Sequence, residues 1–217
     1  MIRGAVAVRP YDARDRAAVR RICHQTGYMG EPADWYWRNA ESFADIWTGY
    51  YTDREPQSCL VAVRGDEVVG YLAGCVDSRA APAPAAALAR AALRHALLLR
   101  PGTAGFLWRG IADAVRQGGA PPDTLDDPRW PSHLHINLAP AGRGAGAGSA
   151  LMAAWQARLA AAGSPGCHLG TLAENTRAVA FFARQGFVRH GDPALAPGMR
   201  TPAGDRMHIQ FMVRAVG

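Results

Sequence analysis

Short apolar stretches and longer amphipathic stretches alternate along the chain, which predicts a domain built from both strands and helices. Short runs of Val, Ile, Leu and aromatic residues indicate strands, which we expect at 5–9, 59–63, 68–76, 133–138, 167–172, 187–190 and 207–213. Apolar residues spaced by three or four positions indicate helices, which we expect at about 10–27, 43–51, 85–99, 105–117, 144–162 and 175–185. Gly65 and Asp66 form a turn signal, so the second and third strands are predicted to form an antiparallel hairpin.

The order of these elements predicts an α/β fold of the α+β type. The early hairpin is antiparallel, whereas the strand–helix–strand unit at 133–172 requires a parallel pair, so the sheet is mixed and flanked by helices. Two helices fall within an insertion at about 78–131, between the third and fourth strands, which ends in a loop at 121–131. The Pro- and Gly-rich stretch at 193–206 is predicted to be a loop. We expect a single domain over 1–217, because no linker divides the chain.

Composition excludes several classes of protein. Hydrophobic residues make up 49% of the 217 residues, which is too many for a disordered chain. The most apolar window, 85–99, is short and carries three basic residues, so we expect no membrane span and no membrane partner. The N-terminus lacks the apolar core of a signal peptide, and the four cysteines form no C-x-x-C pair. We therefore expect a cytoplasmic protein with reduced thiols.

The net charge of +6 has two possible causes. All 24 basic residues are arginines, against 18 acidic residues. They are scattered without a basic run or interleaved aromatic residues, so we expect no nucleic-acid partner. A small polyanionic cofactor accounts for the excess of arginine equally well.

A glycine-rich stretch after the strand at 133–138 is the strongest functional signal. Gly144, Gly146 and Gly148 lie where this strand turns into a helix, so backbone N–H groups can approach a ligand without obstruction. The positive end of the helix dipole favours a phosphate or pyrophosphate, and Arg143 adds a charge beside it. The alternative is an Ala- and Gly-rich loop that reflects composition alone. A P-loop would need a Lys, which this chain lacks, and a Rossmann loop would lie near the first strand.

Two motifs resemble the GCN5-related N-acetyltransferases (GNAT). The sequence RGAGAG at 143–148 is similar to the Arg/Gln-x-x-Gly-x-Gly/Ala signature with which that family binds the pyrophosphate of acetyl-CoA. NTRAVAFFARQGF at 175–187 is similar to the family's Asn-x-x-Ala-x-x-Phe-Tyr-x-x-x-Gly-Phe. The resemblance covers essentially the whole chain. It implies a mostly antiparallel sheet, acetyl-CoA or coenzyme A as cofactor, and an amine of a small molecule or protein as acceptor.

A narrower resemblance involves other segments. DIWTGYYTDREP at 45–56, VGYLAGCVD at 69–77, the helical insertion and PSHLHI at 131–136 resemble the acetyltransferase-like C-terminal domain of O-GlcNAcases and its free-standing bacterial relatives. This resemblance indicates an architecture more than a substrate.

The family resemblance implies direct attack of an amine on the thioester, with the strands at 133–138 and 167–172 splayed around the pantetheine arm. Backbone N–H groups of Leu138 or Ala139 would hold the thioester oxygen, and Asn175 would contact the arm or cap a helix. The cofactor residues implied are Asn137, Leu138, Ala139, Arg143, Gly144, Ala145, Gly146, Ala147, Gly148, Ser149, Asn175, Phe181 and Phe182. Phe182 stands where the family usually has the tyrosine that protonates the thiolate. A catalytically inactive acyl-CoA-binding module is therefore the alternative function.

Three residues are candidates for the general base: His135, Asp77 and Glu174. His133, His135 and Asn137 alternate onto one strand face, and His135 has a pKa suited to relaying a proton. Asp77 and Glu174 are alternatives, and all three residues also have a structural interpretation, as a core histidine or as solvated carboxylates. His133 and His135 lack a third ligand at diagnostic spacing, so we expect no metal.

The acceptor pocket is predicted from an aromatic-rich stretch between 31 and 56. Its candidate wall residues are Trp35, Tyr36, Trp37 and Tyr50. Core packing is the alternative for these side chains. The exposed edge of the last strand is compatible with either a monomer or a homodimer.

Overall fold

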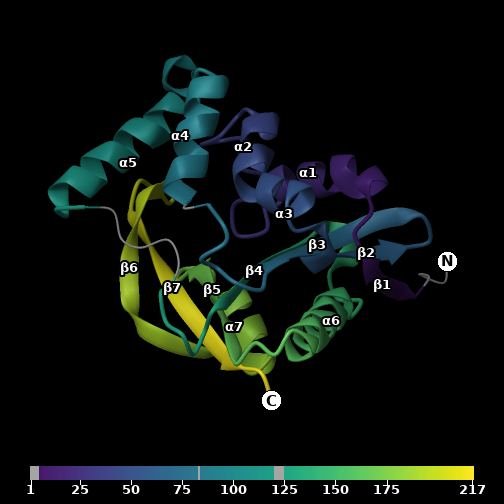
Figure 1. Ribbon diagram of the computed structural model, residues 1–217. Helices are drawn as coiled ribbons and strands as arrows, with labels where there is room; N and C mark the ends of the chain where they lie inside the picture. The colour runs from purple at the N-terminus through teal and green to yellow at the C-terminus, as the bar shows by residue number, and fades with distance from the viewer. Residues whose placement is uncertain (1–4, 83, 120–124) are drawn as a thin grey trace.

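Seven strands form one sheet in the computed structural model, which describes residues 5–82, 84–119 and 125–217. Their order across the sheet is β1-β2-β3-β4-β5-β7-β6 (Figure 1). Among these strands only β4 and β5 pair in parallel, so the sheet is mixed and mostly antiparallel, as predicted. The strands are β1 Val6–Pro10, β2 Cys59–Arg64, β3 Glu67–Cys75, β4 Ser132–Leu138, β5 Gly166–Leu172, β6 Val188–Arg200 and β7 Arg206–Ala215.

Helices cover both faces of the sheet. The described helices are α1 Arg16–Gln25, α2 Ala40–Trp47, α3 Gly49–Asp53, α4 Pro84–Arg94, α5 Ala104–Arg116, α6 Ala147–Ala161 and α7 Thr176–Arg184. Helices α1, α2 and α3 lie on one face, while α6 and α7 lie on the other (Figure 1). None of the described helices is long and apolar enough to span a bilayer.

Strand β3 separates two hydrophobic cores. Its side chains alternate, so Tyr71 and Ala73 join the core under α1 and α2, whereas Leu72 joins the core under α6. The ring of Trp155 on α6 is fully buried against the same strand. A Cβ atom at Gly74 would lie 2.3 Å from that ring, so this position needs glycine. The tight contact fixes α6, and with it the loop that precedes α6, against the sheet.

A buried ion pair ties α5 to β6. The guanidinium of Arg200 donates two hydrogen bonds to the carboxylate of Asp113, at 2.8 and 2.9 Å. The backbone N–H of Gly198 donates a third, at 3.0 Å. The Asp113 side chain is fully buried, and the hydrogen bonds from Arg200 lower its pKa to about 2. The segment between β3 and β4 is therefore anchored to the far edge of the sheet.

The predicted loop at 193–206 is wrong over most of its length, because β6 continues to Arg200. Pro193 and Pro197 favoured a loop, since proline cannot donate a hydrogen bond in a sheet. Among the described strands, β6 lies at the edge and pairs only with β7, so its outer backbone groups face no further strand. The pairing shifts register between His190 and Ala194 and again between Leu195 and Arg200, which accommodates the irregular sequence.

Three predicted helices also have different limits. The helix predicted at 85–99 ends at Arg94, and a 3₁₀ turn, Leu97–Leu99, follows Ala96 in the left-handed region. The helical stretch at 43–51 is divided into α2 and α3 at Thr48. Helix α6 begins at Ala147 rather than 144, because the glycines before it have positive φ angles. The predicted loop at 121–131 lies partly outside the described residues.

Candidate active site

Strands β4 and β5 diverge and leave a gap in the middle of the sheet. They pair only at Ser132 with Cys167 and at His133 with His168. Beyond these pairs, β4 continues to pair with β3 through Leu138, and β5 continues to pair with β7. Backbone groups on the facing edges over 134–138 and 169–172 therefore have no strand partner among the described residues. This divergence agrees with the predicted splay and can accept the backbone-like amides of a ligand.

The glycine-rich loop lies at the open end of the gap and presents backbone N–H groups. Gly144 and Gly146 have φ angles of 71° and 77°, which favour glycine, and the space beside both is open. Gly146 is the N-cap of α6. The first N–H groups of a helix have no acceptor within the helix, so those of α6 are available to an anion. The loop therefore fits a pyrophosphate, as the sequence predicts.

Arg143 lines the cavity beside the glycine-rich loop and is bonded to backbone carbonyl groups of the protein. We expected its charge to lie beside the bound anion. Its Nε donates to the carbonyl of Leu138 at 3.2 Å, and its Nη2 donates to the carbonyl of Gly30. Its Nη1 lies 3.7 Å from a carboxylate oxygen of Glu31. Arg143 therefore holds the glycine-rich loop against the segment that follows α1.

The second motif forms the other wall beside the loop. Asn175 caps α7, because its Oδ1 accepts a hydrogen bond from the N–H of Ala178 at 3.2 Å. A Cβ at Gly148 would lie 3.0 Å from the Phe181 ring, so α6 and α7 approach closely only with glycine there. Phe182 is 7% exposed and packs edge-on against its neighbouring phenylalanines. The motif thus positions the wall through packing and capping.

A large continuous cavity joins these parts, with a volume of about 2070 Å³. All of the predicted cofactor residues line it except Ala139 and Ala145. The expectation that Ala139 holds the thioester oxygen is not supported, because its N–H donates to the carbonyl of Val69 at 2.9 Å. Asn137 lines the cavity with its amide already engaged by Tyr71 and Thr26, at 3.1 and 2.7 Å.

The aromatic residues predicted for the acceptor pocket separate into two groups. Tyr36 and Tyr50 line the cavity, but Trp35 and Trp37 do not. Trp37 is 2% exposed, and its Nε1 donates to Ser42 Oγ at 2.9 Å, so it is a core residue. Trp35 is half-exposed and packs edge-on against its tyrosine neighbours outside the cavity. The sequence pattern could not separate these roles, because adjacent aromatic residues can point to opposite sides.

Of the three candidate bases, one lines the cavity and two lie outside it. His135 lines the cavity, where burial and the nearby His168 lower its pKa to about 4, so it is neutral at pH 7. It makes no hydrogen bond to a described residue. Asp77 is exposed outside the cavity and accepts from the N–H of Arg79 at 3.0 Å. Glu174 also lies outside, paired with His208 at 2.9 Å. The structure gives neither carboxylate a place at the cavity.

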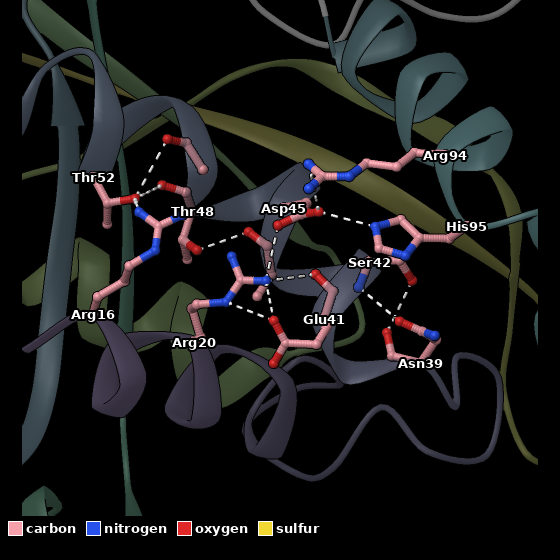
Figure 2. A network of polar contacts seen from close by, with 12 residues as sticks. Arg16, Arg20, Asn39, Glu41, Ser42, Asp45, Thr48, Thr52, Arg94 and His95 are labelled. Carbon is pink, nitrogen blue, oxygen red and sulfur yellow. Dashed lines mark hydrogen bonds and ion pairs between the residues drawn. The ribbon is translucent and has the colours of Figure 1, made fainter.

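A network that the sequence did not reveal links α1, α2 and the residue after α4 beside the cavity (Figure 2). Arg20 donates to Asp45 at 2.8 Å and also bonds Glu41, while His95 lies 3.0 Å from the other oxygen of Asp45. Burial raises the pKa of Asp45, but hydrogen bonds from His95 and Arg20 outweigh it and lower the pKa below the ordinary value. Asp45 is therefore charged and holds the helical segment after β3 against α2.

We expect Asp45→Asn to lower the free energy of unfolding at pH 7 by about 1–2 kcal/mol, because charge-assisted hydrogen bonds from Arg20 and His95 are lost. Since folding lowers the carboxyl pKa, its stabilisation is present above the ordinary pKa. It is lost as the pH falls through the folded-state pKa. Urea unfolding of parent and variant from pH 7 to pH 3 should therefore show a difference that shrinks with acid. Asp34→Asn, at an exposed position, should show no such difference.

The acetyltransferase (GNAT) family model matches residues 29–187, which is most of the chain. The chain belongs to the GNAT acetyltransferase family. GNAT enzymes use acetyl-CoA, and the glycine-rich loop, the N-terminus of α6 and the gap between β4 and β5 are the parts of this chain that fit it. By family and fold the protein is an N-acetyltransferase. The described residues contain no cluster of His, Cys, Asp and Glu that could hold a metal ion.

Solved GNAT structures have the same fold over nearly the whole chain. SsHAT is 24% identical, with a TM-score of 0.66, over 98% of this chain and 99% of SsHAT. The putative acetyltransferase yncA from Salmonella typhimurium, solved with acetyl-CoA, is 16% identical, with a TM-score of 0.60, over 99% and 95%. A phosphinothricin acetyltransferase from Sinorhizobium meliloti, also solved with acetyl-CoA, is 17% identical, with a TM-score of 0.61, over 98% and 89%.

Proposed function

We propose that this protein transfers an acetyl group from acetyl-CoA directly to an amine of a small molecule or a protein. One observation carries the proposal: the cavity runs from the glycine-rich loop, along the gap between β4 and β5, to a wall of aromatic and histidine side chains. The loop suits a pyrophosphate, and the gap suits an amide-bearing arm. The wall at the far end suits the acceptor, since aromatic surfaces bind organic groups and exclude water.

The proposed chemistry needs no covalent intermediate on the enzyme. When bound, acetyl-CoA supplies an activated thioester. The N-terminus of α6 and the loop glycines hold the pyrophosphate, and the exposed edges of β4 and β5 orient the arm. Tyr36 and Tyr50 form part of the acceptor wall, and neutral His135 presents a ring nitrogen that can accept a hydrogen bond from an amine.

The phenylalanine at position 182 in α7 favours a second candidate function, which is acyl-CoA binding without turnover. Phe182 carries no hydroxyl and lies buried where GNAT enzymes usually have the tyrosine that protonates the thiolate. General acid catalysis typically contributes about 10²–10⁴-fold. Loss of this group therefore slows transfer strongly unless another side chain supplies the proton.

Calorimetric titration with acetyl-CoA and with free CoA, followed by a thiol-release assay, separates the two functions. The assay uses a panel of primary amines that includes phenethylamine, ethanolamine and a lysine-containing peptide. We expect micromolar binding together with CoA release in the presence of at least one amine. Binding without release on any of them would favour the inactive module, and no binding would contradict both functions.

We also propose a narrower relationship, to the acetyltransferase-like domain of O-GlcNAcases and its free-standing bacterial relatives. Two features support it: the motif at 45–56, which spans α2 and α3, and the helical segment between β3 and β4, which packs against α2. This relationship concerns the architecture and does not by itself name the acceptor.

A further inference from the structure

Three side chains from separate elements form a hydrogen-bonded chain at the closed end of the gap. Tyr51 on α3 places its Oη 2.7 Å from Nε2 of His133 on β4. Ser78, which follows β3, places its Oγ 2.8 Å from Nδ1 of the same ring. His133 is 5% exposed, and all three residues line the cavity. Both imidazole nitrogens are therefore occupied by hydroxyl groups that reach the cavity.

The surroundings keep the imidazole of His133 neutral. Burial lowers its pKa well below the ordinary value, and the nearby rings of His135 and His168 lower it further. A neutral imidazole has one N–H and one lone pair, so it accepts from one hydroxyl and donates to the other. Such a ring can accept a proton at one nitrogen and release another proton from the second nitrogen, so that it stays neutral overall.

The hydrogen-bonded side chains of Tyr51, His133 and Ser78 lie where the reacting end of the ligand is expected. His133 forms the last pair between β4 and β5, so the gap closes beside it. A ligand that extends from the glycine-rich loop along the gap ends next to these side chains. Tyr50 cannot replace Tyr51, because its hydroxyl donates to Glu55 at 3.2 Å. His135 lies in contact with the Tyr51 ring but makes no hydrogen bond to a described residue.

We propose that Tyr51 is a catalytic residue that takes a proton from the acceptor amine, and that His133 and Ser78 relay it to water. This inference rests on the proposed acetyl transfer. As the new C–N bond forms, the π electron pair of the thioester carbonyl moves to its oxygen and returns when the C–S bond breaks. An N–H bond of the amine breaks, and an O–H bond forms at Tyr51 Oη. The original Tyr51 proton moves to His133 Nε2, the Nδ1 proton moves to Ser78 Oγ, and the Ser78 proton moves to water.

The same relay in reverse supplies the acid that Phe182 cannot supply. After the first transfer, Tyr51 carries the proton taken from the amine, and the imidazole is protonated at Nε2. Tyr51 then donates that proton to the departing thiolate as the C–S bond breaks. The Nε2 proton of His133 returns to Tyr51, Ser78 returns a proton to Nδ1, and water returns a proton to Ser78. Every group regains its starting state, and one proton has moved from amine to thiol.

The resting state of the relay can be measured without cofactor or acceptor. In protein labelled with ¹⁵N-histidine, we expect NMR to show His133 neutral, with Nδ1 protonated and Nε2 unprotonated. Tyr51→Phe removes the hydroxyl that donates to Nε2 of His133. Among the labelled histidine nitrogens, only the Nε2 resonance of His133 should shift. A charged His133 ring, or a proton on Nε2 in the resting protein, would overturn the relay.

Kinetics test whether the relay acts in turnover, with thiol release as readout and, as acceptor, the amine among phenethylamine, ethanolamine and the lysine-containing peptide that gives the fastest release. We expect Tyr51→Phe to lower kcat by about 10²–10⁴-fold, while the Kd for acetyl-CoA from calorimetry stays within about twofold. Ser78→Ala, at a half-buried loop position, is the variant least able to disturb folding and should lower kcat at least about tenfold.

Tyr28→Phe is the matched control, because Tyr28 is also buried and lies outside the cavity lining. Among the described residues its hydroxyl donates only to the sulfur of Met207, at 3.7 Å. Its kcat should remain within about twofold of the parent. A Tyr51→Phe enzyme with parental kcat would overturn the relay and leave the proposed function intact. If the parent enzyme binds acetyl-CoA but acetylates no amine, the proposed function is contradicted instead. The protonation state of His133 seen by NMR then tests the relay by itself.

Discussion

We expect Gly146→Val to raise the Kd for acetyl-CoA by at least about 100-fold in calorimetric titration. Gly146 has a φ of 77°, where a β-branched residue costs about 1–2 kcal/mol. The backbone can relieve this strain only by turning the N–H groups at the start of α6 away from the ligand. Any methyl group that remains there enters the open space in which the pyrophosphate is expected to lie. Strain and obstruction act together, which is why this effect is among the largest that we expect.

Gly163→Val provides a matched control at the opposite end of the same helix. Gly163 follows the last turn of α6, has a φ of 68°, and also has open space beside it. The same strain is therefore introduced into the same helix without touching the loop. We expect similar losses of stability in both variants but parental affinity in Gly163→Val. Parental affinity in Gly146→Val would remove the glycine-rich loop from the cofactor site.

Asp113→Ala should lower the free energy of unfolding by about 3–5 kcal/mol, because it leaves the Arg200 guanidinium with no carboxylate partner. The side chains of Arg200 and Asp113 are 14% and 0% exposed, so water cannot replace the lost carboxylate easily. Urea unfolding at pH 7 measures the loss. Asp126→Ala breaks the exposed pair with Arg79 and should cost less than about 1 kcal/mol.

The cost of Asp113→Ala should also depend on pH. Arg200 lowers the pKa of the folded Asp113 carboxyl to about 2, below its value in an unfolded chain. The stabilisation is therefore fully present above about pH 4 and is lost as the pH falls toward 2. The difference between parent and variant should shrink over that interval. A difference that stays constant down to pH 2 would show that Asp113 acts through packing rather than charge.

Local patterns predicted most of the strands and helices, because their signals lie within a few residues. The alternation of Tyr71, Leu72 and Ala73 is one example, since each residue faces the side that its position requires. The extension of β6 past Pro193 was not predictable, because proline is tolerated there only on account of the edge position of the strand. That position depends on the order of strands in the sheet, which no local pattern contains.

The candidate site was likewise predictable from the sequence only in part. The glycine-rich loop was predictable because its backbone conformation is set by its own residues. The contact of Arg143 with Gly30 and the bond between Tyr51 and His133 join residues that are far apart in sequence, and nothing local specifies them. Tyr51 fell within the helical stretch at 43–51, whereas Trp37 was predicted for the acceptor wall and proved to be core.

The gap between β4 and β5 has a thermodynamic consequence for the folded state. Each strand is paired on one side only along most of its length, so the sheet lacks a strand at its centre. A ligand whose amides fill that place acts as part of the fold and couples its concentration to stability. At 100 times its Kd, such a ligand adds about 2.7 kcal/mol to the free energy of unfolding. The melting temperature of this protein then depends on the concentration of cofactor as well as on the polypeptide itself.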